Sequence, residues 1–430
     1  MQGEASLKKT IQSIARLDYD YQRQLLFIVA DGTIIGQGND RPTPRIVLDI
    51  LGVDPNYTPP DLAFQSIGEG NQQLNYAKVY SGMYDFEFKT IPFIVVVKTG
   101  KPSEAERMGN RYGFIACSNS YSGKRDSQLL LMRFLSKVHY NEPMNPLELE
   151  LYRHMRTIIG VDPSFYEFLF MVDADTTVSS KSLTHLVAAM SRDSQRAAVC
   201  GETQIANARE SWITMIQVYE YFISHHLSKA FESLFGSVLC LPGCFSMYRL
   251  KTPLNKPVLI QKSILEDYGR NSVPTLHGKN LLELGEDRFL TTTVLRHCPN
   301  MRTSYIPEAK CETNVPSSFS VLISQRRRWI NSTVHNFIEL LRTDALCGFC
   351  CFSMRFVVLI DLFGTILQPS GLVYLGYLVY KLKTDEESSF PLISICLVAA
   401  IFGLQFVLLI LKGELQLFGW MVVVCSSKQL

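Results

Sequence analysis

The sequence predicts an α/β domain followed by an apolar C-terminal region that crosses a membrane. Short β-rich runs alternate with helical patterns from residue 1 to about 310, which is typical of α/β proteins. Two apolar segments follow, at about 356–380 with Asp361 as the single charge and at about 390–411 with none. Both reach the roughly 20 residues that a helix needs to cross hydrocarbon. Composition agrees, since 47% of residues are hydrophobic and 19% are charged.

The α/β region contains strand candidates that end in polar residues. The predicted strands are 25–30, 93–97, 167–172, 197–201 and 238–248, and the predicted helices include 125–138, 180–190, 212–235, 287–295 and 320–341. Asp31, Asp173 and Glu202 follow three of these strands. Ligands of open α/β sheets bind at the carboxyl ends of strands. We therefore expect these three side chains to face one crevice.

Charge and motif content exclude several classes of protein. Lys and Arg number 42 against 40 Asp and Glu, so no strong field attracts nucleic acid, and no nucleic-acid partner is expected. Eleven Cys in 430 residues is an ordinary density of free thiols. A Walker P-loop would need Gly at Ser118 and Ser or Thr at Arg125, so a kinase or ATPase loses support.

The C-terminal region predicts an integral membrane protein with a cytoplasmic domain. Basic residues cluster before the first span, at Arg326–Arg328, Arg342 and Arg355, whereas Lys381 and Lys383 follow it. The positive-inside rule then places the α/β domain in the cytoplasm. We expect residues 331–352 to form an interfacial amphipathic helix and linker, residues 353–430 to form the transmembrane region, and a partial third span to begin at about 415.

Asp173 and Asp175 form a candidate metal site. They follow an apolar strand at positions i and i+2, which point the same way on an extended segment. Both carboxylates can then approach one Mg²⁺ or Mn²⁺ that also holds phosphates. Two solvated loop aspartates are the alternative, and the pattern alone does not choose between them.

Two further motifs begin helices. Gly123, Lys124 and Arg125 place a turn and two cations at a helix N-terminus, which suits an anion; a solvated basic turn capped by Asp126 or Ser127 is the alternative. Glu286 and Asp287 begin another helix, where carboxylates either cap the helix or supply a general base. We favour Asp287 as the base and Glu286 as its support.

The segment Gln325–Trp329 combines three arginines with an aromatic ring. Neighbouring helix positions lie about 100° apart, so one Arg can reach a pyrophosphate while another meets lipid headgroups. Trp329 offers a flat face to a sugar ring; an interfacial aromatic with a basic anchor is the alternative. In Leu241–Phe245, Gly243 permits close approach of the backbone to a ligand. His225 and His226 are predicted to be packing residues.

Together these motifs resemble chitin synthases, the membrane-bound family 2 glycosyltransferases of fungi, and among them a class-IV-like branch. The matching segments are Val29-Ala-Asp31-Gly32, Gly123-Lys-Arg-Asp-Ser-Gln128, Asp173-Ala-Asp175, Cys240-Leu-Pro-Gly-Cys-Phe245, Gly285-Glu-Asp287-Arg-Phe-Leu290 and Gln325-Arg-Arg-Arg-Trp329. The resemblance implies a GT-A-type, Rossmann-like nucleotide-sugar transferase domain in residues 1–330. It also implies a plasma-membrane location, a role in cell-wall synthesis, and contact with UDP-GlcNAc, a growing chitin chain, the lipid bilayer and a second copy of the chain.

The implied reaction is processive, inverting transfer of N-acetylglucosamine from UDP-GlcNAc to the 4-hydroxyl of a β-1,4 chain, with a divalent cation, Mg or Mn. Matching by motif, Asp31 and Lys124 contact the uridine, Asp175 and Asp173 the metal-bound diphosphate, and Asp287 the acceptor hydroxyl. The remaining residues implied at the substrate are Gly243, Cys244, Phe245, Gln325, Arg328 and Trp329.

The sequence departs from the family pattern at both ends. The strand that precedes the turn near Gly3 in the family is missing, and the last span is incomplete. The resemblance therefore describes a chain truncated at both ends. Another processive family 2 polysaccharide synthase, or an inactive truncated paralogue that associates with intact synthases, remains an alternative.

Overall fold

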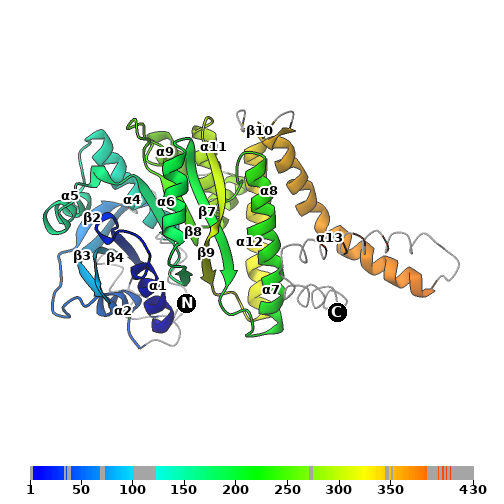
Figure 1. Ribbon diagram of the computed structural model, residues 1–430, viewed down its shortest axis with the longest axis horizontal. Coiled ribbons are helices and arrows are strands. Elements are labelled where there is room, and N and C mark those ends of the chain that lie inside the picture. The colour runs from blue at the N-terminus through cyan, green and yellow to red at the C-terminus, as the bar shows by residue number, and fades with distance from the viewer. Residues whose placement is uncertain are drawn as a thin grey trace.

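The fold is built from two mixed β-sheets and the helices that cover them (Figure 1). The computed structural model describes residues 3–32, 35, 40–67, 73–100, 123–270, 275–343, 348–349 and 352–384, with four single residues beyond. Apart from these four residues, the predicted span at 390–411 lies outside this description, as do the predicted span from about 415 and the cysteines at 347, 350 and 351.

The first sheet has the strand order β1-β4-β3-β2. These strands are β1 (Leu26–Asp31), β4 (Lys89–Lys98), β3 (Leu74–Phe86) and β2 (Leu62–Gln65); β1 and β4 are parallel and the other pairs antiparallel. Alternation along β4 directs Val95 and Val97 to one face, against α1 (Glu4–Ala15) and α2 (Thr43–Ile50). Ile94 and Val96 face α4 (Lys124–Tyr140) and α5 (Pro146–Arg153) on the other side.

The second sheet has the order β5-β8-β7-β9-β6. Its strands are β5 (Phe168–Val172), β8 (Phe245–Arg249), β7 (Arg196–Ile205), β9 (Arg302–Thr313) and β6 (Thr176–Val178). β7 and β9 are parallel, and the other pairs are antiparallel. Helix α6 (Ser182–Arg192) packs Leu186 and Met190 on one face of this sheet.

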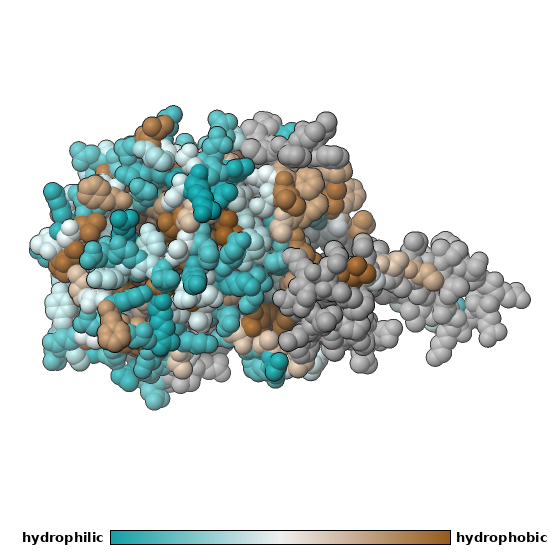
Figure 2. All heavy atoms as spheres, in the orientation of Figure 1, coloured by the Kyte–Doolittle hydropathy of each residue, from teal (hydrophilic) through white to brown (hydrophobic). Residues whose placement is uncertain are grey.

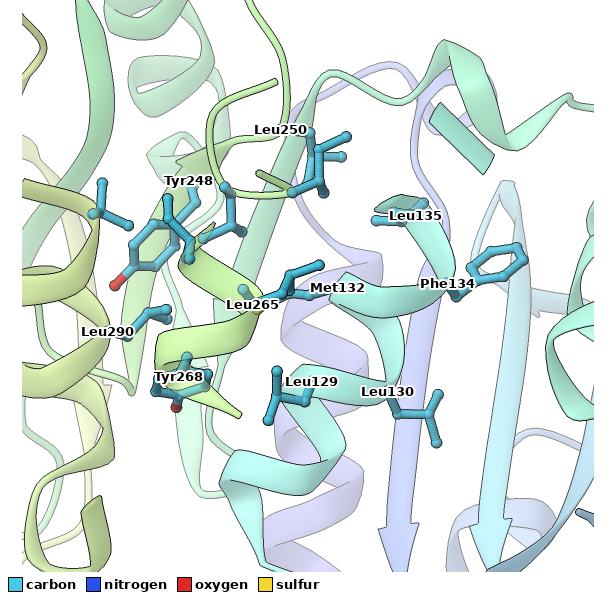
Figure 3. Close-up of a cluster of buried hydrophobic side chains, with 14 of the residues drawn as sticks. Leu129, Leu130, Met132, Phe134, Leu135, Tyr248, Leu250, Leu265, Tyr268 and Leu290 are labelled. Atoms are coloured by element: carbon cyan, nitrogen blue, oxygen red, sulfur yellow. The ribbon is translucent and has the colours of Figure 1, made fainter. Parts of the chain in front are cut away.

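Helix α4 joins the two sheets into one core. Leu129, Met132 and Phe134 are fully buried in a cluster that also contains Ile94 of the first sheet and Tyr248 of the second (Figure 3). Because this helix begins at Lys124, its packing fixes the start of the Gly-Lys-Arg motif relative to both sheets. β1 and β5 are edge strands of half-buried residues, whereas β8 is fully buried.

The second half of the chain is mainly helical. It contains α7 (Trp212–Phe222), the π-helix Ile223–Leu227, α8 (Ser228–Leu234), α9 (Lys262–Tyr268), α10 (Leu276–Leu284), α11 (Glu286–His297), α12 (Phe319–Leu341) and α13 (Met354–Thr384). Short elements are the 3-10 helices Tyr21–Arg23 and Pro163–Phe165, the π-helix His154–Ile159, and strands β10 (Gly348–Phe349) and β11 (Phe352–Ser353). Helix α13 leaves the body beside α12 (Figure 1).

The predicted first span, 356–380, lies within α13. In the part of the chain that the structure describes, no helix combines the length and apolarity required to cross a membrane. This span is therefore not confirmed. The predicted boundary at residue 330 falls in the middle of α12, which runs unbroken from Gln325 to the amphipathic segment.

Other predicted elements agree in position but differ at their ends. The predicted strand 197–201 extends to Ile205, and the predicted strand 238–248 begins only at Phe245. Pro242 and Gly243 precede that start, and Pro cannot donate to a strand ladder. The predicted helix 212–235 is interrupted by a π-helical turn that contains both histidines.

Candidate active site

Lys124 brings two distant carboxylates together at the centre of the site. Its Nζ lies 2.7 Å from Asp173 Oδ1 and 3.4 Å from Asp287 Oδ2. Lys124 begins α4, Asp173 follows β5, and Asp287 lies in the first turn of α11. Three motifs separated by up to 163 residues therefore meet at one ammonium group.

Burial and charge shift the pKa values of this cluster. Burial raises the pKa of Asp173 to about 6, Lys124 opposes the rise, and the like charges of Asp287 and Asp175 add to it. Burial lowers the pKa of the Lys124 ammonium, but the carboxylates of Asp287 and Asp173 outweigh it and the net shift is upward. The cluster thus holds more negative charge than Lys124 neutralises, which suits a further cation.

Close packing fixes the carboxylate of Asp287. A Cβ atom at Gly243 would overlap this carboxylate, so the Leu-Pro-Gly-Cys-Phe turn presses its backbone on the predicted base. A Cβ atom at Gly285 would overlap the Ser332 hydroxyl of α12. Because neither glycine has a side chain, α11 can begin close to both the Leu-Pro-Gly-Cys-Phe turn and α12. No side chain caps the N-terminus of α11.

Asp126 has a structural role that differs from the alternative of a helix cap. Its carboxylate is 2.7 Å from Lys98 Nζ, and both side chains are 2% exposed. It also accepts hydrogen bonds from the Ser66 hydroxyl and the Ile67 amide. This buried ion pair ties the start of α4 to the end of β4, and the helix is capped by Gly123 instead.

Helix α12 brings an aromatic group to the site. Arg326 donates to Glu220 over 2.7 Å, and its guanidinium lies 4.2 Å from the Trp329 ring centroid. The Tyr221 and Trp329 rings are 6.5 Å apart. Burial raises the pKa of Tyr221, with a contribution from Asp175 and opposition from Arg326. Through this ring contact, α7, which contains Tyr221, lies beside Trp329 of α12.

The other predicted residues of this segment differ in exposure. Gln325 Oε1 and Arg326 Nη1 are buried and, among the described residues, make no hydrogen bond. Arg328 is exposed, and by its i,i+3 spacing lies on the same helix face as Gln325. Arg326 lies three residues before Trp329, and this i,i+3 spacing is the sequence signal that would have identified it as the arginine that contacts the ring.

The remaining predicted residues fall into three groups. Cys244 is half-buried, its carbonyl oxygen accepts from the Asp173 amide over 3.4 Å, and Phe245 is fully buried. Asp31 ends β1, and its side chain lies outside the described atoms. Glu202 lies inside β7, where its carboxylate pairs with His226 and Lys310. The expectation that Glu202 shares a crevice with Asp31 and Asp173 stays a prediction, because the Asp31 side chain lies outside the described atoms.

The carboxylates fit a divalent cation held jointly with a diphosphate. In the described part of the chain, no three His, Cys, Asp or Glu side chains converge as metal ligands. Mg²⁺ is commonly bound by one or two carboxylates together with substrate phosphates. Asp173 and Asp175, on either side of Ala174, suit that mode.

The mixed α/β sheets and the carboxylates at strand ends are consistent with a GT-A-like glycosyltransferase domain. A family model described as chitin synthase matches residues 1–429. The chain is 58% identical over 425 residues to "Chitin synthase 5" of Verticillium dahliae, with 98% of this chain and 23% of that protein covered. It is 57% identical over 423 residues to "Chitin synthase 6" of Mycosarcoma maydis, with 98% and 35% covered. The chain belongs to the chitin synthase family.

The chain therefore spans 23–35% of the length of these relatives. The predicted membership of this family is confirmed. The class-IV-like branch stays a prediction.

Proposed function

We propose that this chain carries the transferase site of a chitin synthase. The reaction is processive, inverting transfer of N-acetylglucosamine from UDP-GlcNAc to the 4-hydroxyl at the end of a β-1,4 chain. The observation that carries the proposal is the contact of Lys124 with both Asp173 and Asp287. It places a donor-side carboxylate and a candidate base within the reach of one side chain.

Asp287 is the group that removes the acceptor proton. A sugar hydroxyl is a weak nucleophile, so a positioned carboxylate must take its proton as the oxygen attacks the anomeric carbon. The Asp287 side chain is 29% exposed, and its Oδ2 lies 3.4 Å from Lys124 Nζ. Glu286, beside Asp287 in the first turn of α11, adds to the negative electrostatic potential at the acceptor proton. Inversion in one step requires no enzyme nucleophile.

The leaving UDP accumulates negative charge that cations must stabilise. Lys124 is the nearest cation to the carboxylates, and Arg328 offers an exposed guanidinium from α12. Asp173 and Asp175 would hold a divalent cation, which when bound supplies charge stabilisation to the diphosphate. Asp31, at the end of β1, is assigned to the uridine by its motif.

The acceptor sugar is assigned to the aromatic side of the site. Trp329 of α12 is half-buried and lies beside the buried ring of Tyr221, and Gln325 supplies a buried amide oxygen with no partner among the described residues. Aromatic faces pack against the apolar faces of sugar rings, while the buried amide can accept a hydroxyl hydrogen bond.

We propose that the protein acts at a membrane, with the α/β domain on the cytoplasmic side. Exposed apolar side chains gather on the side from which α13 leaves, including Phe231 and Leu234 of α8 and Ile330 of α12 (Figure 2). On α13 itself Phe363, Ile366 and Leu367 are more than half exposed. Such a surface favours contact with lipid.

The test is incorporation of labelled sugar by the purified full chain reconstituted in lipid. We expect polymer from UDP-GlcNAc that chitinase degrades, a dependence on Mg²⁺ or Mn²⁺ that chelation removes, and no polymer from UDP-glucose. Preferential use of UDP-glucose would favour another processive synthase. Binding of UDP without incorporation from either donor would favour the inactive paralogue.

A further inference from the structure

A buried polar contact surface joins the catalytic helix α11 to α12. Ser332 and Asn336 of α12 are 1% and 2% exposed, and Thr292 of α11 is 1% exposed. Asn336 donates to the Ser332 carbonyl, and Thr292 donates to Asn336 Oδ1 over 3.4 Å. Gly285 packs on Ser332 at the start of α11. These contacts set Asp287 of α11 relative to Trp329 of α12.

A chain of hydrogen bonds with a fixed direction extends this surface to α10. Asn280 Nδ2 lies 3.2 Å from His335 Nε2, His335 Nδ1 lies 2.6 Å from His277 Nδ1, and His277 Nε2 lies 3.1 Å from Glu339 Oε1. An amide Nδ2 can only donate, and a carboxylate can only accept. In this arrangement His335 Nε2 accepts from Asn280, and its Nδ1 carries the proton that His277 Nδ1 accepts.

The charged groups around the two rings all meet at Glu339. Its Oε2 accepts from Arg296 of α11 over 2.6 Å, and its Oε1 accepts from Arg342 over 3.1 Å. Glu339 thereby joins α10, α11 and α12. Burial lowers the pKa of His335, and His277 lowers it further. No carboxylate of the described residues contacts His335 directly to offset a positive charge there.

We propose that His277 and His335 are positioning residues whose hydrogen-bond chain holds α10 and the start of α11 on α12, and that protonation of His335 releases this hold. The inference rests on the proposed function, because it concerns the geometry of Asp287 and Trp329. Gly285 ends α10 and caps α11, so a displacement of α10 is transmitted to Asp287 without an intervening loop.

The physical cause is a conflict between donors. A proton on His335 Nε2 would face the Asn280 amide donor across 3.2 Å. The folded state therefore binds this proton less readily than the unfolded chain does. The stability that these hydrogen bonds contribute to the folded state is fully present above the ordinary histidine pKa of about 6.5. It is lost as the pH falls below that value.

The variants His335→Asn and His335→Ala separate positioning from folding. An asparagine amide can donate to His277 Nδ1, and it can rotate to accept once that nitrogen is protonated. We expect H335N to keep wild-type incorporation at pH 7.5 and to lose less kcat than the wild type as the pH falls below about 6.5. The acid loss that remains in H335N comes from the site carboxylates, since burial raises the pKa of Asp173 to about 6. H335A should lower kcat at every pH, with the KM for UDP-GlcNAc unchanged.

The matched control is His297→Gln. His297 is also on α11, and its Nε2 pairs with Asp267 at 2.7 Å outside this chain of hydrogen bonds. We expect H297Q to retain the wild-type acid loss. Parallel pH profiles for wild type and H335N would overturn the proposal.

A second readout does not need activity. We expect the thermal unfolding midpoint of the wild type to fall below about pH 6.5 more steeply than that of H335N. If the wild type incorporates no sugar at any pH, the proposed function fails, and this comparison still decides whether the histidine chain is proton-sensitive. Equal slopes in the two proteins would overturn it.

Discussion

Replacing Asp287 with Asn tests the assignment of the base with little change in shape. The amide is isosteric with the carboxylate, so the close packing against Gly243 is retained. Lys124 loses a 3.4 Å contact but keeps its 2.7 Å contact with Asp173. The substitution therefore removes proton acceptance and leaves most of the cluster in place.

The two consequences differ in size. Loss of a partly exposed ion pair costs up to about 1 kcal/mol of folding stability. Loss of a general base costs about 10²–10⁴-fold in rate, which is about 3–5 kcal/mol of transition-state stabilisation. The rate must therefore fall far more than stability or UDP affinity.

The assay is initial-rate incorporation from UDP-GlcNAc, with UDP binding measured by calorimetry on the same samples. The control is Glu286→Gln, which removes a neighbouring carboxylate from the same helix turn. We expect D287N to lose at least about 100-fold in kcat with UDP affinity retained, and E286Q to lose less than about tenfold. Comparable losses in the two variants, or near-normal polymer formation by D287N, would refute the assignment.

Two further substitutions separate packing from chemistry. Asp126→Asn breaks the buried pair with Lys98 and should lower the free energy of unfolding by about 3–5 kcal/mol in denaturant unfolding. The control Asp49→Asn, in a more exposed ion pair, should cost less than about 1 kcal/mol. Equal costs would contradict the structural role of Asp126. Gly243→Ala should displace the Asp287 carboxylate and lower kcat by about 100-fold with a near-normal unfolding midpoint, and a variant of wild-type rate would show that this close contact is not required.

The sequence predicted best those helices and strands that a local hydrophobic pattern marks. Hydrophobic runs predicted β1, β4 and β5 to within a few residues, and helices α4 and α12 to within two. Strand β9 was not predicted, because Pro307 and several charged residues interrupt the pattern of Arg302–Thr313. The structure accommodates this interruption as a register shift against Gly201 and Glu202.

Contacts between distant segments were the part that the sequence could not supply. The sequence allowed Asp173 and Asp287 to be proposed as functional. It did not show that Lys124 contacts both of them, because this contact depends on the packing of α4 between the two sheets. The sequence offered Asp126 only as one of two alternative helix caps, because its partner Lys98 lies in a distant strand and no local pattern marks the pair. The histidine chain depends likewise on α10 lying against α12.

The most direct measurement of the central claim is an anomalous difference map of the protein crystallised with UDP and Mn²⁺. The account predicts a manganese peak at Asp173 and Asp175, with the diphosphate within hydrogen-bond reach of Lys124 and the carboxylate of Asp287 facing the open side. A nucleotide bound away from these residues, or a manganese peak elsewhere with none at the two aspartates, would contradict it.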